Sequence, residues 1–327
     1  MENTREFANF SPSFSFLNIP VKFIIVLMIV RLIGCGAVGT VVADKLSQVS
    51  DFALIVDERR RKSYGSGIYL NERRLDLFME EPSHAAKADL VIVAVKNFSL
   101  YDSLPMIEPF VKDDTVIMSL LNGIDAEGIL SERFGEEKVL PSFITDLSSN
   151  HSGNETVCFS GGGTIVFGER SGIVSDRVKK IKVLFEEAGQ RYIVPDDIMH
   201  EKWWKFMLNT CYNTLSAILD ADYAAICDNQ DFIRAVRIIA KEVQQVARAE
   251  GVTITQDDIE LMIRRMASHR DHGKTSMLQD VEAGRESENA FFSGTVSRLA
   301  HQHGIDAPNT DLIYILLEAR RSVIAKH

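Results

Sequence analysis

The sequence lacks three features that would each point to a particular class of protein. Its four cysteines lie far apart without CxxC spacing, which argues against a disulfide framework or a zinc site and is typical of reduced thiols in the cytoplasm. The formal net charge of −10 argues against a nucleic-acid-binding protein, because such proteins normally carry a basic patch. The apolar run at 23–30 is too short to cross a bilayer, which needs about 20 apolar residues. We therefore expect no metal, no nucleic-acid partner and no membrane partner.

The composition is that of an ordinary soluble globular protein with two domains. The chain has 327 residues, of which 46% are hydrophobic and 25% charged, and a domain typically contains about 100–200 residues. The apolar run at 23–30 merges with the strand that must precede Gly34. We predict that the fold starts at Met28 and that residues 1–27 are an N-terminal extension outside it, with the start site, Met1 or Met28, left open.

The order of hydrophobic patterns predicts an α/β domain followed by an all-α domain. Up to Pro195, apolar runs rich in β-branched residues alternate with amphipathic stretches, which is typical of parallel strands covered by helices on both faces. Beyond Pro195 only long helical patterns occur. We expect a mostly parallel Rossmann sheet in residues 28–195, a helical substrate-binding and catalytic domain in residues 196–327, and an active site between them. The predicted strands are 28–34, 52–57, 89–95, 115–121 and 161–169, and the predicted helices are 37–48, 174–188, 197–219, 230–250, 255–270, 274–303 and 308–325.

A GxGxxG fingerprint follows the first predicted strand and opens the first predicted helix, the context in which this pattern indicates dinucleotide binding. The first glycine permits a tight turn, the second lets the backbone approach a pyrophosphate, and the third allows close helix–strand packing. The helix N-terminus favours the phosphate charge. The fingerprint consists of Gly34, Cys35, Gly36, Ala37, Val38 and Gly39.

The residues after the second strand leave the choice of cofactor open. Asp57 lies close to the spacing of about 20 residues at which an acid binds the ribose 2′-hydroxyl of NAD. Arg59 and Arg60 follow at once, and their guanidinium groups are suited to a 2′-phosphate. The arginine run is equally explained as the solvated start of a helix.

A polar stripe lies on an otherwise apolar helical stretch. Lys205, Asn209 and Asn213 are spaced at i, i+4 and i+8, which places them on one helix face. A lysine on a mostly buried helix is costly unless it has a partner or a function, and between two domains it could donate a proton to a substrate oxygen. The alternative is a lysine that reaches solvent beside two capping asparagines.

Further candidate residues lie after two strands and in the late helical region. Lys96 and Asn122 each follow a predicted strand of the Rossmann domain, where such loops meet the cofactor. Ser276 and Glu288 lie about three turns apart, so on a single helix both would face the same side. Asp280 and Arg285, between them, are suited to pairing or capping.

Several spaced motifs, in this order, resemble the ketopantoate reductase (2-dehydropantoate 2-reductase) family from about Met28 to the C-terminus. This set is far more specific than the fingerprint alone, and it favours a functional reading of Lys205. The motifs are GCGAVG at 34–39, AVK at 94–96, LNG at 121–123, WWKFMLNTCYN at 203–213, SMLQD at 276–280, GRESE at 284–288 and GIDAPNT at 304–310.

The resemblance implies NADPH-dependent reduction of 2-dehydropantoate to pantoate, on the route to pantothenate and coenzyme A, with NAD(H) still possible as the cofactor. The lysine matching Lys205 acts as the general acid in that family, and the glutamate matching Glu288 lies near it and the substrate hydroxyls. We further expect a small 2-oxo acid as substrate and a homodimer as the assembly. The residues matching Asn122, Asn209, Asn213 and Ser276 hold substrate or nicotinamide.

Two departures from the family pattern put the identity of the substrate in doubt. Gly273 stands where some members have an asparagine that contacts substrate. After Glu288 the chain reads NAFFSG at 289–294, where the family more often has an acid and an Asn-Gly pair. The alternatives are a related 2-oxo-acid reductase of the same architecture and a non-catalytic NADP-sensing protein, although Lys205 and Glu288 argue against the latter.

Overall fold

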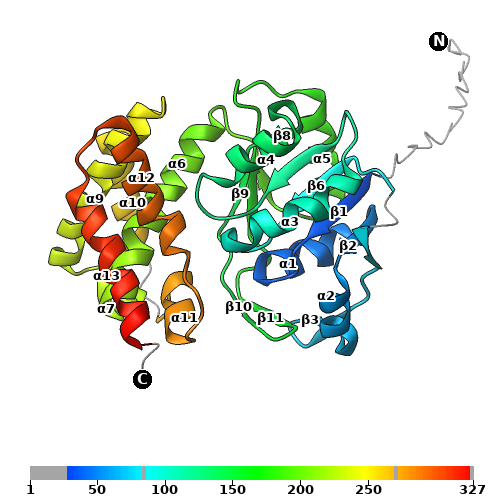
Figure 1. Ribbon diagram of the computed structural model, residues 1–327, viewed down its shortest axis with the longest axis horizontal. Helices are drawn as coiled ribbons and strands as arrows, with labels where there is room; N and C mark the ends of the chain where they lie inside the picture. Colours follow the sequence, from blue (N-terminus) through cyan, green and yellow to red (C-terminus); the bar gives the residue numbers. More distant parts are fainter. Residues whose placement is uncertain (1–27, 83–85, 269–271, 325–327) are drawn as a thin grey trace, which may run out of the picture.

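A six-stranded parallel sheet forms the centre of the first part of the chain (Figure 1). The structure is a computed structural model that describes residues 28–82, 86–268 and 272–324, so the predicted extension at 1–27 lies outside the described residues. The strand order departs in opposite directions from the pair β1 and β6, and ligands of such sheets bind at this switch point. In spatial order the strands are β5 (Met79–Glu80), β2 (Asp51–Ile55), β1 (Ile29–Ile33), β6 (Leu90–Val93), β7 (Val116–Ser119) and β8 (Val139–Leu140).

Helices cover both faces of this sheet, which explains why its strands are mostly apolar, with the buried Arg31 of β1, paired with Asp51 and Glu80, as an exception. In β1, Val30 and Leu32 point to the face where α1 and α5 pack, whereas Ile33 points to the opposite face, against α3 and α4. Because both faces are buried, successive residues of a strand are apolar instead of alternating with polar ones. The surrounding helices are α1 (Ala37–Leu46), α2 (Glu58–Ser63), α3 (Leu100–Ile107), α4 (Ala126–Phe134) and α5 (Asp176–Glu187).

Two smaller sheets accompany the central one, and most of their short strands were not anticipated from the sequence. The predicted strand at 161–169 forms, but it belongs to a three-stranded sheet and not to the parallel one. A four-stranded sheet extends from the Rossmann core toward the helical part (Figure 1). The strands of the two sheets, in spatial order, are β13 (Tyr192–Ile193), β12 (Thr164–Phe167) and β9 (Ser142–Thr145), and β10 (Ser149–Ser152), β11 (Glu155–Cys158), β3 (Ile68–Leu70) and β4 (Arg73–Leu75).

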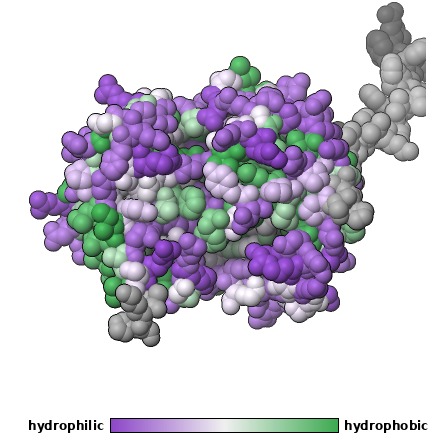
Figure 2. All heavy atoms as spheres, viewed as in Figure 1, coloured by the Kyte–Doolittle hydropathy of each residue, from purple (hydrophilic) through white to green (hydrophobic). Residues whose placement is uncertain are grey.

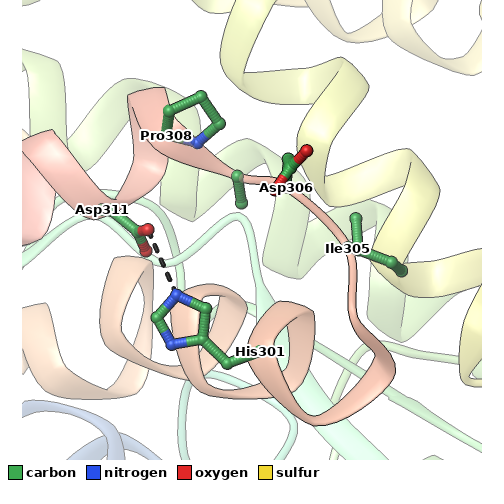
Figure 3. Close-up of a pocket in the computed structure, with 6 residues that line it drawn as sticks. His301, Ile305, Asp306, Pro308 and Asp311 are labelled. Atoms are coloured by element: carbon green, nitrogen blue, oxygen red, sulfur yellow. Dashed lines mark hydrogen bonds and ion pairs between the residues drawn. The ribbon is translucent and has the colours of Figure 1, made fainter.

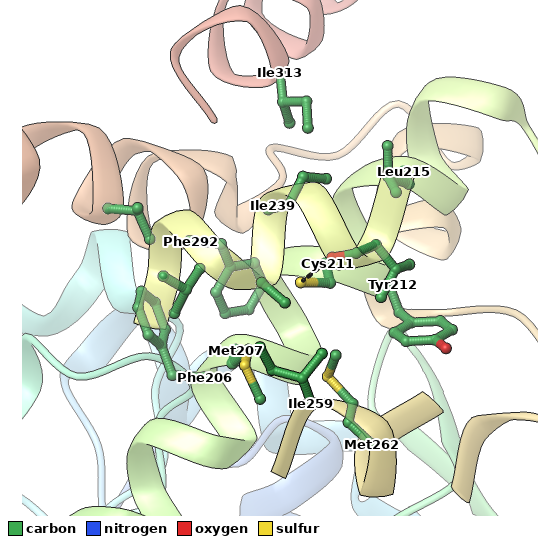
Figure 4. Close-up of a cluster of buried hydrophobic side chains, with 14 of the residues drawn as sticks. Phe206, Met207, Cys211, Tyr212, Leu215, Ile239, Ile259, Met262, Phe292 and Ile313 are labelled. Carbon is green, nitrogen blue, oxygen red and sulfur yellow. Dashed lines mark hydrogen bonds between the residues drawn. The ribbon is translucent and has the colours of Figure 1, made fainter. Parts of the chain in front are cut away.

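The second part of the chain is helical and packs around α9. The buried residues Val236, Ile239 and Val243 recur along α9 at helical spacing and form an apolar stripe. Figure 4 shows Ile239 and Phe206 within the cluster of buried side chains that this stripe helps to build. No helix among the described residues is long and apolar enough to cross a membrane. The division of the chain between residues 195 and 196 stays a prediction. The helices are α6 (Ile198–Leu208), α7 (Thr214–Leu219), α8 (Tyr223–Ile226), α9 (Gln230–Ala249), α10 (Gln256–Met266), α11 (Ser276–Glu282), α12 (Ser293–His303) and α13 (Pro308–Ile324).

The predicted continuous helix over 274–303 is wrong, because the chain breaks after α11. Gly284 has a φ of 64°, a left-handed conformation that ends the helix, and the N–H of Arg285 returns to the carbonyl of Asp280 at 2.8 Å. A short 3₁₀ turn, η7 (Glu288–Phe291), then precedes α12. Ser276 and Glu288 therefore lie on different elements and not on one helix face.

The GIDAPNT segment joins α12 to α13 and is held by a buried glutamate of α9. Gly304 ends α12 in a left-handed conformation, and Pro308 begins α13. The Glu242 carboxylate accepts hydrogen bonds from the backbone N–H groups of Asn309 at 3.1 Å and Thr310 at 2.8 Å, and from both of their side chains. This contact satisfies N–H groups that the first turn of a helix leaves unpaired.

Candidate active site

The glycine fingerprint forms the turn between β1 and α1, at the switch point of the sheet. Gly34 has a φ of 96°, and a Cβ atom there would lie 2.6 Å from the carbonyl oxygen of Ala94. A Cβ on Gly39 would overlap the Gly34 carbonyl oxygen, whereas a Cβ on Gly36 would meet no atom within 4 Å. No side chain caps α1, so the N–H groups of its first turn are left for a ligand. This open backbone at a helix N-terminus fits the pyrophosphate of a dinucleotide.

The side chains of the arginine run after β2 have different surroundings. Asp57 caps α2, because its side chain accepts the backbone N–H of Arg60 at 2.6 Å. Arg61 turns to the edge of the sheet and donates to the Met79 carbonyl at 3.1 Å, whereas Arg59 is exposed. Burial raises the pKa of Cys35 in the fingerprint to about 11, and the charge of Arg60 is one of the groups that oppose this rise. Arg60 is thus the arginine whose charge reaches the fingerprint.

Positive charges from three separate segments act on His151 of β10. Burial lowers the pKa of this histidine, and the charges of Arg285, Arg60 and Lys96 lower it further. A cavity of about 490 Å³ between β10 and α11 is lined in part by Arg285 and Lys274. These cations are suited to phosphate groups, even though the whole chain is acidic. His151 carried no motif, and nothing in the sequence alone singled it out.

Lys96 joins the loop after β6 to the helical part. Its ammonium lies 2.9 Å from Oδ2 of Asp280 on α11, and the second oxygen of Asp280 accepts Nε of Arg285 at 2.8 Å. The predicted pairing of Asp280 with Arg285 is therefore present. Asp280 is buried, so the contact fixes the position of this loop relative to α11.

Lys205, Asn209, Asn213 and Ser276 lie together where α6 continues into a π-helical turn (Asn209–Asn213). The Asn213 amide lies 3.5 Å from the Ser276 hydroxyl, at the limit of a hydrogen bond. No hydrogen bond or ion pair joins the side chains of Lys205 and Asn209 to any residue in the described ranges. Lys205 is only partly exposed, and desolvation lowers its pKa, while the charge of Asp146 opposes that effect. Lys205 and Asn209 are thus polar side chains without a hydrogen-bond or ion-pair partner in the described ranges, next to the contact between Asn213 and Ser276.

Glu288 contacts the Rossmann part and not Lys205. Its carboxylate accepts the amide of Asn122 at 3.0 Å and the amide of Asn97 at 2.8 Å. The predicted contact between Glu288 and Lys205 therefore stays a prediction. Asn97 was not among the predicted site residues, although it directly follows Lys96, and only its burial in the fold reveals it.

A second lysine of α6 is paired, in contrast to Lys205. Lys202 is buried, forms an ion pair with Glu127 of α4, and donates to the Ser142 carbonyl at 3.0 Å. These contacts join α6 to the Rossmann part. The sequence pattern did not separate Lys202 from Lys205, because both lie in the same apolar stretch.

A small pocket of about 230 Å³ lies away from these residues, at the turn between α12 and α13 (Figure 3). His301 and Asp311 face each other across it, with Nε2 and Oδ2 3.3 Å apart. None of the predicted site residues lines this pocket. It is therefore not part of the candidate site.

Comparison with known proteins assigns the chain. The family model "Ketopantoate reductase PanE/ApbA" matches residues 30–172, and the model of the C-terminal part of the same family matches residues 197–321. The chain belongs to the ketopantoate reductase family. It is an oxidoreductase of that family, and the fold agrees with the assignment.

Individual members of the family show how far the likeness extends. The 2-dehydropantoate 2-reductase of Pyrococcus horikoshii is 28% identical over 305 residues, which cover 90% of this chain and 98% of the relative. The solved 2-dehydropantoate 2-reductase of Geobacter metallireducens is 26% identical with a TM-score of 0.78, covering 88% of this chain and 99% of that structure. D-mandelate dehydrogenase with NADH and anilino(oxo)acetate has the same fold, with a TM-score of 0.81, 22% identity, and coverage of 90% and 99%.

Two positions that depart from the ketopantoate reductase pattern have structural partners. The carbonyl of Gly273 accepts the N–H of Tyr223 at 2.9 Å. Ser293 is fully buried and hydrogen-bonds the side chain of Asn289, which in turn contacts the Tyr314 carbonyl of α13 at 3.1 Å. Ser293 is thus linked to α13 through Asn289.

Proposed function

We propose that this protein reduces 2-dehydropantoate to pantoate with NADPH, in the pathway to pantothenate and coenzyme A, and that Lys205 is the general acid. The observation that carries the proposal is the set of unpartnered polar groups at Lys205 and Asn209, beside Asn213 and Ser276. A buried or half-buried cation without a partner is costly, so its retention favours a role with a ligand. The four thiols support the cytoplasm as the compartment.

In this proposal the protein supplies positioning and a proton. A bound reduced nicotinamide supplies the hydride that adds to the ketone carbon. The Lys205 ammonium donates a proton to the ketone oxygen, which becomes the hydroxyl of the product, and Lys205 is then reprotonated from solvent. Ser276, Asn209 and Asn213 bind the substrate, and Asn122 holds the substrate or the nicotinamide. Glu288 binds a hydroxyl of the substrate.

NADPH is preferred over NADH in this proposal because of Arg60. Its charge reaches the fingerprint, while Asp57 already caps α2. The test is the ratio of kcat/KM for NADPH and NADH, in the wild type and in Arg59→Ala/Arg60→Ala. Loss of the phosphate contact costs about 1.5–3 kcal/mol, mostly in NADPH affinity. A preference for NADH that the double substitution leaves unchanged would assign specificity to Asp57 instead.

A related 2-oxo acid is the second candidate substrate. D-mandelate dehydrogenase, solved with anilino(oxo)acetate, has this fold, and Gly273 and Ala290 depart from the family pattern. A panel of 2-oxo acids, with ketopantoate and aromatic oxoacids, assayed with each cofactor separates the two candidates. Tight NADPH binding without turnover of any of them would support a non-catalytic NADP sensor.

We also propose a homodimer that forms through α13. The ketopantoate reductase of Staphylococcus aureus is dimeric. Hydrophobic residues gather over α13 at the left of Figure 2, where Leu312, Ile315 and Leu316 are exposed. A second copy that covers this stripe would remove it from water. Light scattering of the wild type and of Ile315→Asp tests this, since the substitution should shift a dimer toward monomer.

A further inference from the structure

A closed ring of hydrogen bonds joins three residues across the domain interface. The Asn97 amide donates to Oε1 of Glu288 at 2.8 Å and to the carbonyl of Asn122 at 2.9 Å, and the Asn97 backbone N–H lies 3.3 Å from the same Oε1. The Asn122 amide completes the ring by donating to Oε2 of Glu288 at 3.0 Å. Each oxygen of the carboxylate is thus held by the Rossmann part.

The ring fixes the orientation of the Asn97 side chain. Both partners of its nitrogen are acceptors, a carboxylate and a carbonyl, so the amide group cannot be turned around without losing both bonds. Asn97 and Glu288 are buried, with 3% and 4% of their surfaces exposed, so water does not readily replace a lost donor. Substituting Asn97 would therefore leave Glu288 with less support on the side of the Rossmann domain.

The position of Asn97 in the chain brings this ring to the loops that follow β6 and β7. Asn97 begins the 3₁₀ turn η3 (Asn97–Ser99) directly after Lys96, which pairs with Asp280. Asn122 follows β7, and Glu288 begins η7 in the helical part. The loops at the carboxyl ends of two strands thus meet the turn that carries the candidate glutamate.

From these contacts we propose that Asn97 is a positioning residue, which holds the Glu288 carboxylate and the Asn122 loop in one fixed arrangement for the reaction. It acts through Glu288 and touches neither substrate nor cofactor. The inference rests on the proposed function, because it assigns the ring a role in the reduction of a 2-oxo acid. A displacement of about 1 Å at a reacting centre can cost about 100-fold in rate, which sets the scale of the expected effect.

The experiment compares Asn97→Ala with a matched control, Thr295→Val. Thr295 is buried on α12 and bonds Asp125 of the Rossmann part, so its substitution also removes a hydrogen bond across the interface, but one in which none of the three ring residues takes part. We expect Asn97→Ala to lower kcat about 10- to 100-fold and Thr295→Val to change it less than about twofold. The dissociation constant for NADPH should stay within about twofold in both. An Asn97→Ala variant that keeps wild-type kcat would overturn the inference.

A double-mutant cycle and an exchange measurement separate positioning from a general loss of structure. If Asn97 acts through Glu288, Asn97→Ala should cost little further kcat in a Glu288→Gln background, and equal losses in both backgrounds would overturn the inference. Hydrogen exchange over residues 286–292 should accelerate more in Asn97→Ala than in Thr295→Val, which removes only a long contact, of 3.4 Å, to the Ala290 carbonyl in this segment. Unchanged exchange would show that Asn97 does not hold Glu288. A wild type that reduces no 2-oxo acid overturns the proposed function and with it the catalytic role of the ring, while the exchange result alone decides whether the tether exists.

Discussion

Two lysines less than one turn apart on α6 have opposite surroundings. Lys202 is closed off by protein groups, since it pairs with Glu127 and donates to the Ser142 carbonyl. Lys205 has no such partner among the described residues, and the nearby Asn209 amide has none either. The first arrangement is complete without a ligand and holds two parts of the chain together, whereas under the proposed function a ligand completes the second. The same residue type on the same helix would then serve stability at one position and chemistry at another.

Removing the unpartnered lysine should have the largest effect on activity. We expect Lys205→Ala to lower kcat about 10²- to 10⁴-fold, because a positioned proton donor is lost, with little change in NADPH affinity. Steady-state kinetics and cofactor titration measure the two effects. Near-normal turnover with the preferred 2-oxo acid would remove Lys205 from the mechanism.

Replacing Lys205 should raise the stability of the folded protein, although it lowers the activity. Burial lowers its pKa in the folded state below the ordinary value of 10.5, so the unfolded state binds more protons between the two values. The contribution of Lys205 to the free energy of unfolding therefore rises with pH in that window and is unfavourable below it. Lys205→Met should unfold at higher denaturant concentration than the wild type at pH 7, and a lower midpoint would contradict this.

Removing the paired lysine should instead affect mainly stability. We expect Lys202→Met to lower the free energy of unfolding by about 3–5 kcal/mol, because it leaves the buried Glu127 carboxylate uncompensated. Adding Glu127→Leu should recover much of the loss, since no charge is then left buried. Chemical denaturation measures both variants. A loss of kcat in Lys202→Met as large as that in Lys205→Ala would erase the distinction between the two lysines.

The pH dependence of the reduction should depend on the protonation of Lys205. Lys205 must carry a proton to donate it, and burial lowers its pKa, so kcat/KM should fall as pH rises through a value below 10.5. Above that value the rate should drop about tenfold per pH unit. Lys205→Arg should remove this alkaline decline, because a guanidinium stays protonated. The same decline in Lys205→Arg would assign it to another group.

Of the substitutions near Lys205, the one at Ser276 should have the smallest effect. Its hydroxyl is a neutral hydrogen-bonding group, worth about 0.5–1.5 kcal/mol, which corresponds to roughly 2- to 13-fold in binding. We expect Ser276→Ala to raise KM for the 2-oxo acid by this factor and to leave the affinity for NADPH unchanged. An effect confined to the cofactor would move Ser276 out of the substrate site.

The sequence predicted those parts of the fold that depend on local pattern. The parallel strands follow from continuous apolar runs and α9 from hydrophobic periodicity, and the structure buries the expected residues, among them Val30, Ile33 and Val243. The short strands of the two smaller sheets have two to four residues each, too few for periodicity to show. The predicted helix over 274–303 failed for a different reason. The left-handed turn at Gly284 ends it, although a single glycine inside a helical pattern does not always do so.

The candidate site was predictable only where its residues share a motif. Lys205 and the asparagines follow from their spacing and from the resemblance to a family. Asn97 and Lys202 were missed because their roles depend on contacts with Glu288 and Glu127, which are far away in the sequence. Long-range pairing of this kind leaves no periodic signal in the sequence. A search for patterns therefore cannot distinguish a polar residue that joins two parts of the chain from one that does not.

The π-helical turn at Asn209–Asn213 widens the helix at the two asparagines of the site. Such a turn bonds residues i and i+5, so it contains one residue more than an α-helical turn between the same ends. Deleting Cys211 would let the segment revert to a regular helix. Lys205 and Asn213 would still lie on one face of that helix, because about seven residues at about 100° each turn the chain by nearly two full turns. A one-residue deletion at this turn should therefore change the spacing of Asn209 and Asn213 more than the direction of Lys205.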